Sequence, residues 1–387
     1  MLHMAACGLL AAAGYAAWSV LPVLLRVLTT DSGIAETNTG FLGSADLTGI
    51  LVGSLCLSRI TRPGNSRLIG AGAIVLGLLT NLATPWVHGL LALILIRCLA
   101  GLAGGVCISL AIAGLARFGD ASFNTGVYSA FAILGVSAEL LLFSYLEGAI
   151  GGSVGCCLII ALFFIAAASL LKWYPEMGAI PEAEKSIEHM SRPSRNVQSV
   201  RMPFNILGSI LLYGIGVSGI FAYASIIGRK NGIADDDMTQ IFNVGNILTL
   251  ISSWASVKVA HRFGPAPLQI MSLILFAALL AVTPAEGSPI TYSVLVMAMM
   301  QLTILVQNSQ IDLLLQYDSS GKTAALVPTA LGIGLAVGPL LGSLLLTTFE
   351  SYKAQLITES ICMLAAGSIL ILAFFARKLR ALLSPPS

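Results

Sequence analysis

The sequence predicts an all-α membrane protein with twelve transmembrane helices in two pseudo-symmetric bundles of six. Only 10% of the 387 residues are charged and 57% are hydrophobic, whereas about a quarter of the residues in a typical soluble domain are charged. Apolar runs of roughly 20 residues, long enough to cross a bilayer, recur from one end of the chain to the other. The two sets of six runs share sequence similarity and are separated by a polar linker.

Charged residues, Gly-Pro pairs and Asp/Asn clusters mark the ends of each apolar run. The predicted spans of the first half are 4–28, 41–58, 67–86, 90–115, 125–147 and 152–173, and those of the second are 203–226, 238–256, 266–285, 290–315, 323–347 and 354–377. Residues 1–173 and 203–377 form the bundles, with a cytoplasmic linker at 174–202 and a cytoplasmic tail at 378–387. The eighth span is the weakest, because asparagines and serines dilute it. The first run lacks a basic n-region, so it is expected to be a retained helix and not a signal peptide.

The basic residues give the expected orientation. If both termini are cytoplasmic, fifteen Lys and Arg lie in the inside segments, Arg97 lies within a span, and only Arg26, Arg229, Lys230 and Lys353 lie outside. This is the distribution that the positive-inside rule describes. Compact loops and short tails favour the plasma membrane of a bacterium, which is its inner membrane, as the location. The bilayer is then the chain's main partner, and we expect a monomer.

An internal repeat relates the two halves. The segments TRPGNSRLI (61–69) and HRFGPAPLQ (261–269) follow the second and eighth spans, and an offset of 200 aligns Arg62 with Arg262 and Gly64 with Gly264. The same offset places Asp46 on Asn246. Two related six-helix halves allow alternating access, in which one half rocks against the other around a site near the midplane.

Several classes of function lack their sequence signals. There is no GxxxxGK[ST] phosphate loop and no HExxH motif. Four scattered histidines and seven cysteines, all inside predicted spans, show no metal-ligand spacing, so the cysteines are expected to be small packing residues. The net charge of +2 reflects the inside loops and does not indicate nucleic-acid binding. We therefore expect no enzyme, no metal and no cofactor.

Three short motifs resemble patterns of the major facilitator superfamily, and the architecture resembles that family over essentially the whole chain. The family's loop motif, G-x-L-x-x-D-R-x-G-R-R, is retained only as Arg62-Pro63-Gly64 and Arg262-Phe263-Gly264, with Thr61 and His261 at the Asp position. The resemblance implies that Arg62, Gly64, Arg262 and Gly264 belong to a conformational loop motif. The missing aspartates put the family's latch in question for this chain.

The second motif is LILIRCLAGLAGG (93–105), which looks like the fourth-helix pattern L-x-x-x-R-x-x-Q-G with Ala100 in place of Gln. In drug/proton antiporters of the family this arginine, here Arg97, is linked to proton coupling. The antiporter pattern G-x-x-x-G-P-x-x-G belongs on the fifth helix of the family. Here it stands on the eleventh span, as Gly334, Gly338, Pro339 and Gly342.

Glu139 is an acid in the middle of an otherwise apolar run, FAILGVSAELLLFSY (131–145). A charge at the bilayer centre costs roughly 2.5–3.5 kcal/mol on insertion scales, and burial disfavours the charged form of a carboxyl group. No other acid stands as deep in a run, so Glu139 is a candidate proton-coupling or substrate-contacting residue. The alternative is a neutral carboxyl that hydrogen-bonds a neighbour in apolar packing.

Asp46 and Arg97 stand at similar depth in the second and fourth spans. A pair between them would lower the cost of both charges, either as a structural ion pair or as a gated proton switch. The sequence leaves open whether they touch.

Candidate substrate-binding residues are polar or aromatic side chains within spans. Gln301 and Asn308 share a face of the tenth span, where they would line a cavity or join helices. Tyr15 and Trp18 share a face of the first span, as an apolar wall or as an interfacial belt. Phe221 and Tyr223 are weaker candidates of the same type.

These features together predict a proton-coupled secondary active transporter that moves a small amphipathic or drug-like molecule by alternating access, as an exporter. The proton gradient supplies the driving force. One alternative is proton-coupled uptake of a small organic acid, with Arg97 binding its carboxylate. An alternative of another class is a non-transporting membrane receptor or scaffold.

Overall fold

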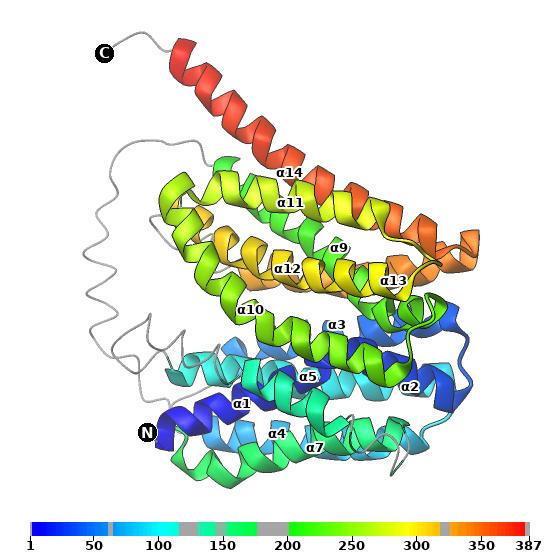
Figure 1. Cartoon of the computed structure of the whole chain (residues 1–387). Coiled ribbons are helices and arrows are strands. Elements are labelled where there is room, and N and C mark those ends of the chain that lie inside the picture. Colours follow the sequence, from blue (N-terminus) through cyan, green and yellow to red (C-terminus); the bar gives the residue numbers. More distant parts are fainter. Residues whose placement is uncertain are drawn as a thin grey trace.

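The structure is a computed structural model in which two bundles of long helices lie against each other (Figure 1). It describes residues 2–60, 65–115, 131, 133–143, 145, 150, 152–175, 201–317 and 326–383. Within these ranges every regular element is helical. The helices of the first half of the sequence lie together in one bundle, and those of the second half lie together in the other.

The helices begin and end close to the predicted boundaries. The first bundle contains α1 (Leu2–Ser19), α2 (Leu21–Ser32), α3 (Thr39–Ile60), α4 (Ser66–Ala83), α5 (Leu90–Leu115), the helix Ile133–Phe143 and α7 (Gly152–Leu170), with 3₁₀ turns η1 (Glu36–Asn38), η2 (Thr84–Trp86) and η3 (Leu171–Trp173). The second contains α9 (Arg201–Lys230), α10 (Asp235–Phe263), α11 (Pro265–Val282), α12 (Pro289–Tyr317), α13 (Val327–Phe349) and α14 (Tyr352–Leu383). Residues 176–200, most of the predicted linker, lie outside the described residues.

Twelve spans result when three further segments are added to the helices that qualify by length and hydropathy. Within the described ranges, nine helices are long and apolar enough to cross a membrane, and α1 with α2 would make a tenth. The helix Ile133–Phe143 is shorter, because its flanks lie outside the described residues. α10 is long enough, but its polar residues dilute it, as the sequence indicated.

The first span differs from the continuous helix predicted at 4–28. It is broken at Val20, and α1 and α2 meet at an angle of 52°. Pro22 lies at the start of α2; it has no N–H to donate to the preceding turn, and its ring disfavours a continuous helix. The break follows directly after Trp18, one of the predicted substrate-binding residues.

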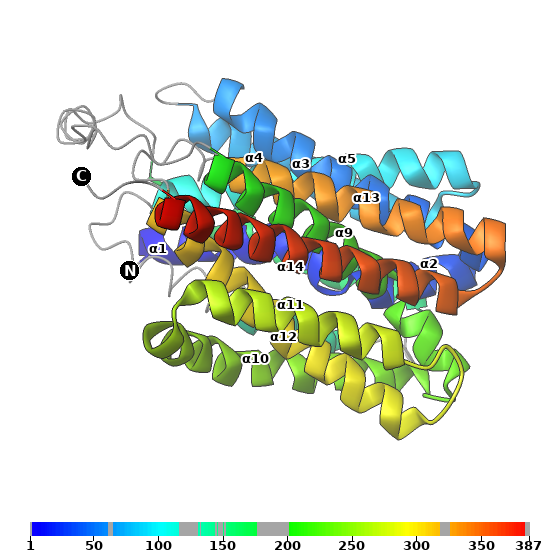
Figure 2. The ribbon, with the colours of Figure 1, turned by 90° about the horizontal axis from the view of Figure 1, so that it is seen from above.

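α3 lies between α5 of its own bundle and α13 of the other (Figure 2). Glycines bring both neighbours into backbone contact with it. A Cβ placed at Gly101 of α5 would overlap the carbonyl oxygen of Asp46, and a Cβ at Gly40 would overlap the carbonyl oxygen of Pro339 on α13. Small residues that allow such close approach are a common basis for helix packing in membranes.

The last helix extends further than predicted. α14 continues to Leu383, whereas the sequence placed the end of the span at residue 377, and its end projects beyond the bundle in Figure 1. Lys378 therefore continues the helix instead of starting an irregular tail.

Candidate functional site

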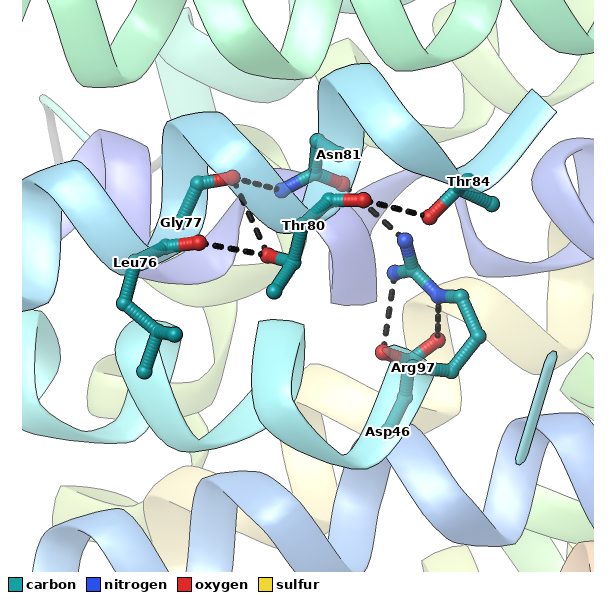
Figure 3. A network of polar contacts seen from close by, with 7 residues as sticks. All are labelled: Asp46, Leu76, Gly77, Thr80, Asn81, Thr84 and Arg97. Atoms are coloured by element: carbon teal, nitrogen blue, oxygen red, sulfur yellow. Dashed lines mark hydrogen bonds and ion pairs between the residues drawn. The ribbon is translucent and has the colours of Figure 1, made fainter. Parts of the chain in front are cut away.

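A buried ion pair joins α3 to α5, and it answers the question that the sequence left open. Arg97 donates from Nε to Oδ2 of Asp46 at 2.9 Å and from Nη2 to Oδ1 at 2.8 Å (Figure 3). Arg97 is 0% exposed and Asp46 is 1% exposed. Two parallel N–H groups of the guanidinium thus bind the two carboxylate oxygens. Each charge neutralises the other, so neither is buried unpaired.

Asn81 of α4 is a third member of this site, and the sequence analysis did not identify it. Arg97 donates from Nη1 to Oδ1 of Asn81 at 3.0 Å, and Asn81 donates from Nδ2 to the carbonyl of Gly77 at 2.8 Å. The amide is therefore held by its own helix and orients the guanidinium (Figure 3). Asn81 stands shortly before Thr84 and a proline, where a span is expected to end. A polar residue at such a place does not attract attention in the sequence.

Glu139 lies in the helix Ile133–Phe143 and is 1% exposed. Neither of its carboxyl oxygens has a hydrogen-bond partner among the described residues. Glu139 and Arg97 belong to the same part of the first bundle, because both are near Cys156 of α7. The sequence analysis named an alternative role for Glu139, a neutral carboxyl that hydrogen-bonds a neighbour in apolar packing. The described neighbours provide no such hydrogen bond.

The same helix contacts the other bundle. Asn246 of α10, the residue that the repeat aligns with Asp46, donates from Nδ2 to the Ile133 carbonyl and to Ser137 Oγ, both at 3.1 Å. Ser137 is two residues before Glu139. A change at Glu139 therefore lies next to an interface between the halves.

Glu359 of α14 is a further buried acid, which the sequence analysis did not identify. Glu359 is 5% exposed, and its Oε1 accepts a hydrogen bond of 2.9 Å from Gln355 Nε2. The residue stands close to the start of its span, where the sequence suggests contact with headgroups or water. Gly219 of α9 makes room for the carboxyl, since a Cβ there would overlap Glu359 Oε1. The glycines of α9, the helix that faces Glu359, are the sequence signal that could have indicated this buried acid.

The aromatic candidates occupy two different environments. Trp18 and Phe221 face each other from opposite bundles, with ring centroids 6.5 Å apart, and Tyr15 is half-buried one turn before Trp18. Phe221 also lines a small apolar cavity of about 10 Å³, close to the volume that one water molecule needs. The full lining of this cavity is Ile220, Phe221, Ala224, Phe242, Val296 and Met299.

Tyr223, by contrast, is fully buried in the contact between the halves. Its hydroxyl accepts a hydrogen bond of 3.0 Å from the Gly40 backbone N–H of α3 and makes another of 2.9 Å with Ser343 Oγ of α13. In this conformation Tyr223 connects the bundles instead of facing a cavity.

Gln301 and Asn308 join α12 to α10. Gln301 donates from Nε2 to the Gly245 carbonyl at 3.0 Å, and Asn308 donates from Nδ2 to Ser256 Oγ at 2.8 Å. This arrangement corresponds to the interhelical alternative named in the sequence analysis. A contact with substrate in another conformation stays a prediction.

The loop motif is described only in its second copy. Arg62 and Gly64 lie outside the described residues. Arg262 is exposed in the last turn of α10, and Gly264 follows with a φ of +85°, a conformation that favours glycine. Gly264 therefore provides the sharp connection between α10 and α11.

Charged and aromatic groups close the molecule at one end, which we call the η1 end. Arg26 of α2, 1% exposed, forms an ion pair of 2.5 Å with Asp235 of α10, and Arg229 of α9 lies 3.1 Å from the same carboxylate. Tyr352 donates to Glu36 of η1 at 2.6 Å. Burial works to raise the pKa of Asp235, but Arg26 and Arg229 outweigh burial and hold this pKa below its ordinary value.

Metal-binding side chains do not gather in the described part of the chain. No group of three or more His, Cys, Asp or Glu residues lies close enough there to hold an ion. The cysteines are free thiols, four of them buried.

Comparison with known proteins identifies the family. The family model described as Major Facilitator Superfamily matches residues 6–317, and no curated protein matches the sequence. A crystal structure of a D-xylose–proton symporter is similar, with a TM-score of 0.65, 15% identity, and coverage of 97% of this chain and 95% of that one. The xylose transporter XylE from E. coli, in a partially occluded inward-open conformation, has a TM-score of 0.66 and 16% identity, covering 96% of each chain.

These similarities confirm the predicted fold class, two six-helix bundles that together make twelve spans. The family match extends across both halves and the connection between them. This chain belongs to the major facilitator superfamily.

Proposed function

We propose that the protein is a proton-coupled secondary active transporter that exports a small amphipathic or drug-like molecule by alternating access. Membership of the family indicates a membrane transporter of small molecules and not an enzyme. The observation that carries proton coupling is the buried carboxyl of Glu139, which has no hydrogen-bond partner among the described residues.

The chemistry of Glu139 suits a coupling role. A carboxyl group in this environment is stable only when neutral, since burial disfavours its charged form. Loss of the proton leaves a buried charge, and the protein lowers this cost by moving the group toward water. The contact between Ser137 and Asn246 of the other bundle links such a movement to the relative position of the halves.

The apolar surroundings of Phe221 support an amphipathic substrate. The side chains that line the small cavity there are all apolar, and Trp18 adds an aromatic ring from the other bundle. Uptake of an organic acid through Arg97 is the second candidate, and it is disfavoured here because both oxygens of Asp46 already occupy the guanidinium. One similar structure is named as a proton symporter, which supports proton coupling but does not choose the direction.

The setting of the transporter completes the proposal. Both termini lie in the cytoplasm and the protein works as a monomer in the plasma membrane of a bacterium, with the proton gradient as its only driving force. The asymmetric distribution of Lys and Arg supports this orientation.

Transport into proteoliposomes with an imposed pH gradient tests the proposal. A fluorescent lipophilic cation and a fluorescent lipophilic acid serve as probes. We expect the cation to move against its gradient with the wild type and Glu139→Gln to lose this pH-driven accumulation. Asp312→Asn is the matched control, because Asp312 is an exposed acid on α12. Full pH-driven transport by Glu139→Gln would contradict the role of Glu139.

A further inference from the structure

Glu359, a buried acid in addition to Asp46 and Glu139, has an incomplete set of hydrogen bonds. Gln355 uses one N–H of its amide on Glu359 Oε1 at 2.9 Å and contacts the Gly219 carbonyl at 3.2 Å through the same nitrogen. Two buried oxygens then have no partner among the described residues, Glu359 Oε2 and Gln355 Oε1. The described part of the site thus has two acceptor oxygens without a hydrogen bond, and no donor that reaches either of them.

Rotating the Gln355 amide does not repair this shortage. A rotated amide would direct its oxygen at the Gly219 carbonyl and at the Glu359 carboxyl, both of which are acceptors when the acid is ionised. The amide orientation is therefore fixed by its two acceptors. A proton on Glu359 adds the missing donor, and residues four apart on a helix are neighbours, so the acid can form a second hydrogen bond to the amide.

Among the described residues, the titratable groups near Glu359 offer no positive charge. They are Tyr223 of α9, Tyr292 of α12 and Cys362 of α14. Tyr292 donates its own proton to the Ala224 carbonyl at 2.7 Å. On the side of α11, Ser360 donates to the Ala277 carbonyl at 2.8 Å. Among the described residues no cation forms a salt bridge with Glu359, so a proton is the simplest means of neutralising it.

The pair lies directly under the closed η1 end. Gly342 of α13 brings Gln355 and Tyr223 together, since a Cβ there would lie 3.0 Å from Gln355 Nε2 and 2.7 Å from the Tyr223 ring. The Tyr223 hydroxyl hydrogen-bonds Gly40 of the first bundle at 3.0 Å. The Tyr223 ring also packs on the ring of Tyr352, with the ring centroids 6.1 Å apart. The Tyr352 hydroxyl donates a hydrogen bond to Glu36.

We propose that Glu359 is a proton-binding site of the second bundle, separate from Glu139, and that its proton holds the η1 end closed. When the proton leaves, a charged oxygen faces the acceptor oxygen of Gln355 and the carboxyl is no longer compensated. The amide and Tyr223 then lose their fixed positions, and the contact with Gly40 weakens. The inference rests on the proposed alternation between two conformations, but not on Glu139 or on any substrate.

Distance measurements between spin labels test the proposal on the purified full-length chain. The labels sit on Ala35→Cys and Ser288→Cys, two exposed positions on the two sides of the η1 end. The half-buried Cys56, Cys98 and Cys362 are replaced by serine. We expect the wild-type distance to be short at mildly acidic pH and to lengthen at mildly alkaline pH. Glu359→Gln carries a permanent N–H donor, so it should stay at the short distance at both pH values.

Two controls separate this proposal from the role of Glu139. Glu139→Gln should lose pH-driven transport but keep the pH-dependent distance, and Asp312→Asn should keep both. Infrared difference spectra should show a titrating carboxyl C=O band that is missing in Glu359→Gln. If that variant does not fold, Gln355→Leu removes one of the two acceptor oxygens and should shift the pH midpoint of the distance change.

Three results would overturn the proposal. They are a Glu359→Gln variant that follows the wild-type pH response, an infrared spectrum with no band assigned to Glu359, and a distance that follows sodium concentration at constant pH.

Discussion

The Arg97–Asp46 contact has the geometry of a structural ion pair and the location of a switch. Removing one partner of a buried pair leaves the other charge uncompensated and costs about 3–5 kcal/mol. We therefore expect Asp46→Asn to lower the thermal stability of the purified protein strongly. Asp46→Asn combined with Arg97→Gln should recover part of the loss. The thermal midpoints of both variants and of Asp312→Asn check this, and a double variant less stable than Asp46→Asn alone would contradict it.

At the residue scale the sequence identified charges but not their partners. A charge inside an apolar run is conspicuous, so Asp46, Arg97 and Glu139 could be found without a structure. Asn81 and Glu359 stand close to span ends, where polar residues are common, and only the packing of neighbouring helices buries them. The side chains that complete a buried site depend on which helices meet, and one sequence does not contain that information.

At the scale of single helices, the glycine contacts between α3 and α5 make a sharp prediction. A Cβ at Gly101 would overlap the Asp46 carbonyl, whereas a Cβ at Gly72 of α4 meets nothing within 4 Å. Overpacking costs typically about 1–3 kcal/mol. Gly101→Ala should therefore lower the midpoint of thermal unfolding, and Gly72→Ala should leave it unchanged or raise it slightly. Equal midpoints for the two variants would show that the helices separate easily.

Most helix limits could be predicted because charges, prolines and glycines mark them. The fourth span was predicted at 90–115 and α5 is Leu90–Leu115. The break at Val20 could not be predicted, although Pro22 stands in the sequence. Membrane helices often tolerate proline when neighbouring groups hydrogen-bond the backbone carbonyls that the proline leaves without a partner. Whether a proline bends or interrupts a helix depends on those neighbours.

At the scale of the whole molecule, Asp235 joins the two bundles and should respond to pH in a different range from the buried acids. Its pKa is lowered in the folded protein. The stabilising contribution of Asp235 is therefore fully present above the ordinary Asp pKa of about 3.9, and it is lost as the pH falls through the lower value of the folded state. Between mildly acidic and mildly alkaline pH, Asp235 stays ionised.

Asp235→Asn should accordingly loosen the η1 end at neutral pH, and the variant and the wild type should become alike only in strong acid. The label pair at positions 35 and 288 measures this, with the exposed neighbour Asp236→Asn as the control. If the wild-type end opened between neutral and mildly acidic pH and Asp235→Asn abolished that opening, Asp235 would be the sensor instead.

The two-bundle organisation itself was predictable from the repeat, because similar segments at an offset of 200 residues imply similar halves. The relative position of the halves was not, because it depends on contacts such as Ser44 Oγ to the Ala336 carbonyl at 2.6 Å that no pattern within one span announces.

α3 belongs to two interfaces at once, since Gly40 touches α13 and Asp46 touches α5. The two residues are about 9 Å apart along one rigid helix, so the position of α13 and the environment of the ion pair are linked. Thermodynamic linkage is reciprocal: if a bound ligand that favours one position of α13 changes the proton affinity of the first bundle by some factor, protonation changes the affinity for that ligand by the same factor. Adding substrate to the protein in weakly buffered detergent should then release or take up protons, and an indicator dye would measure how many protons are linked to substrate binding without any membrane.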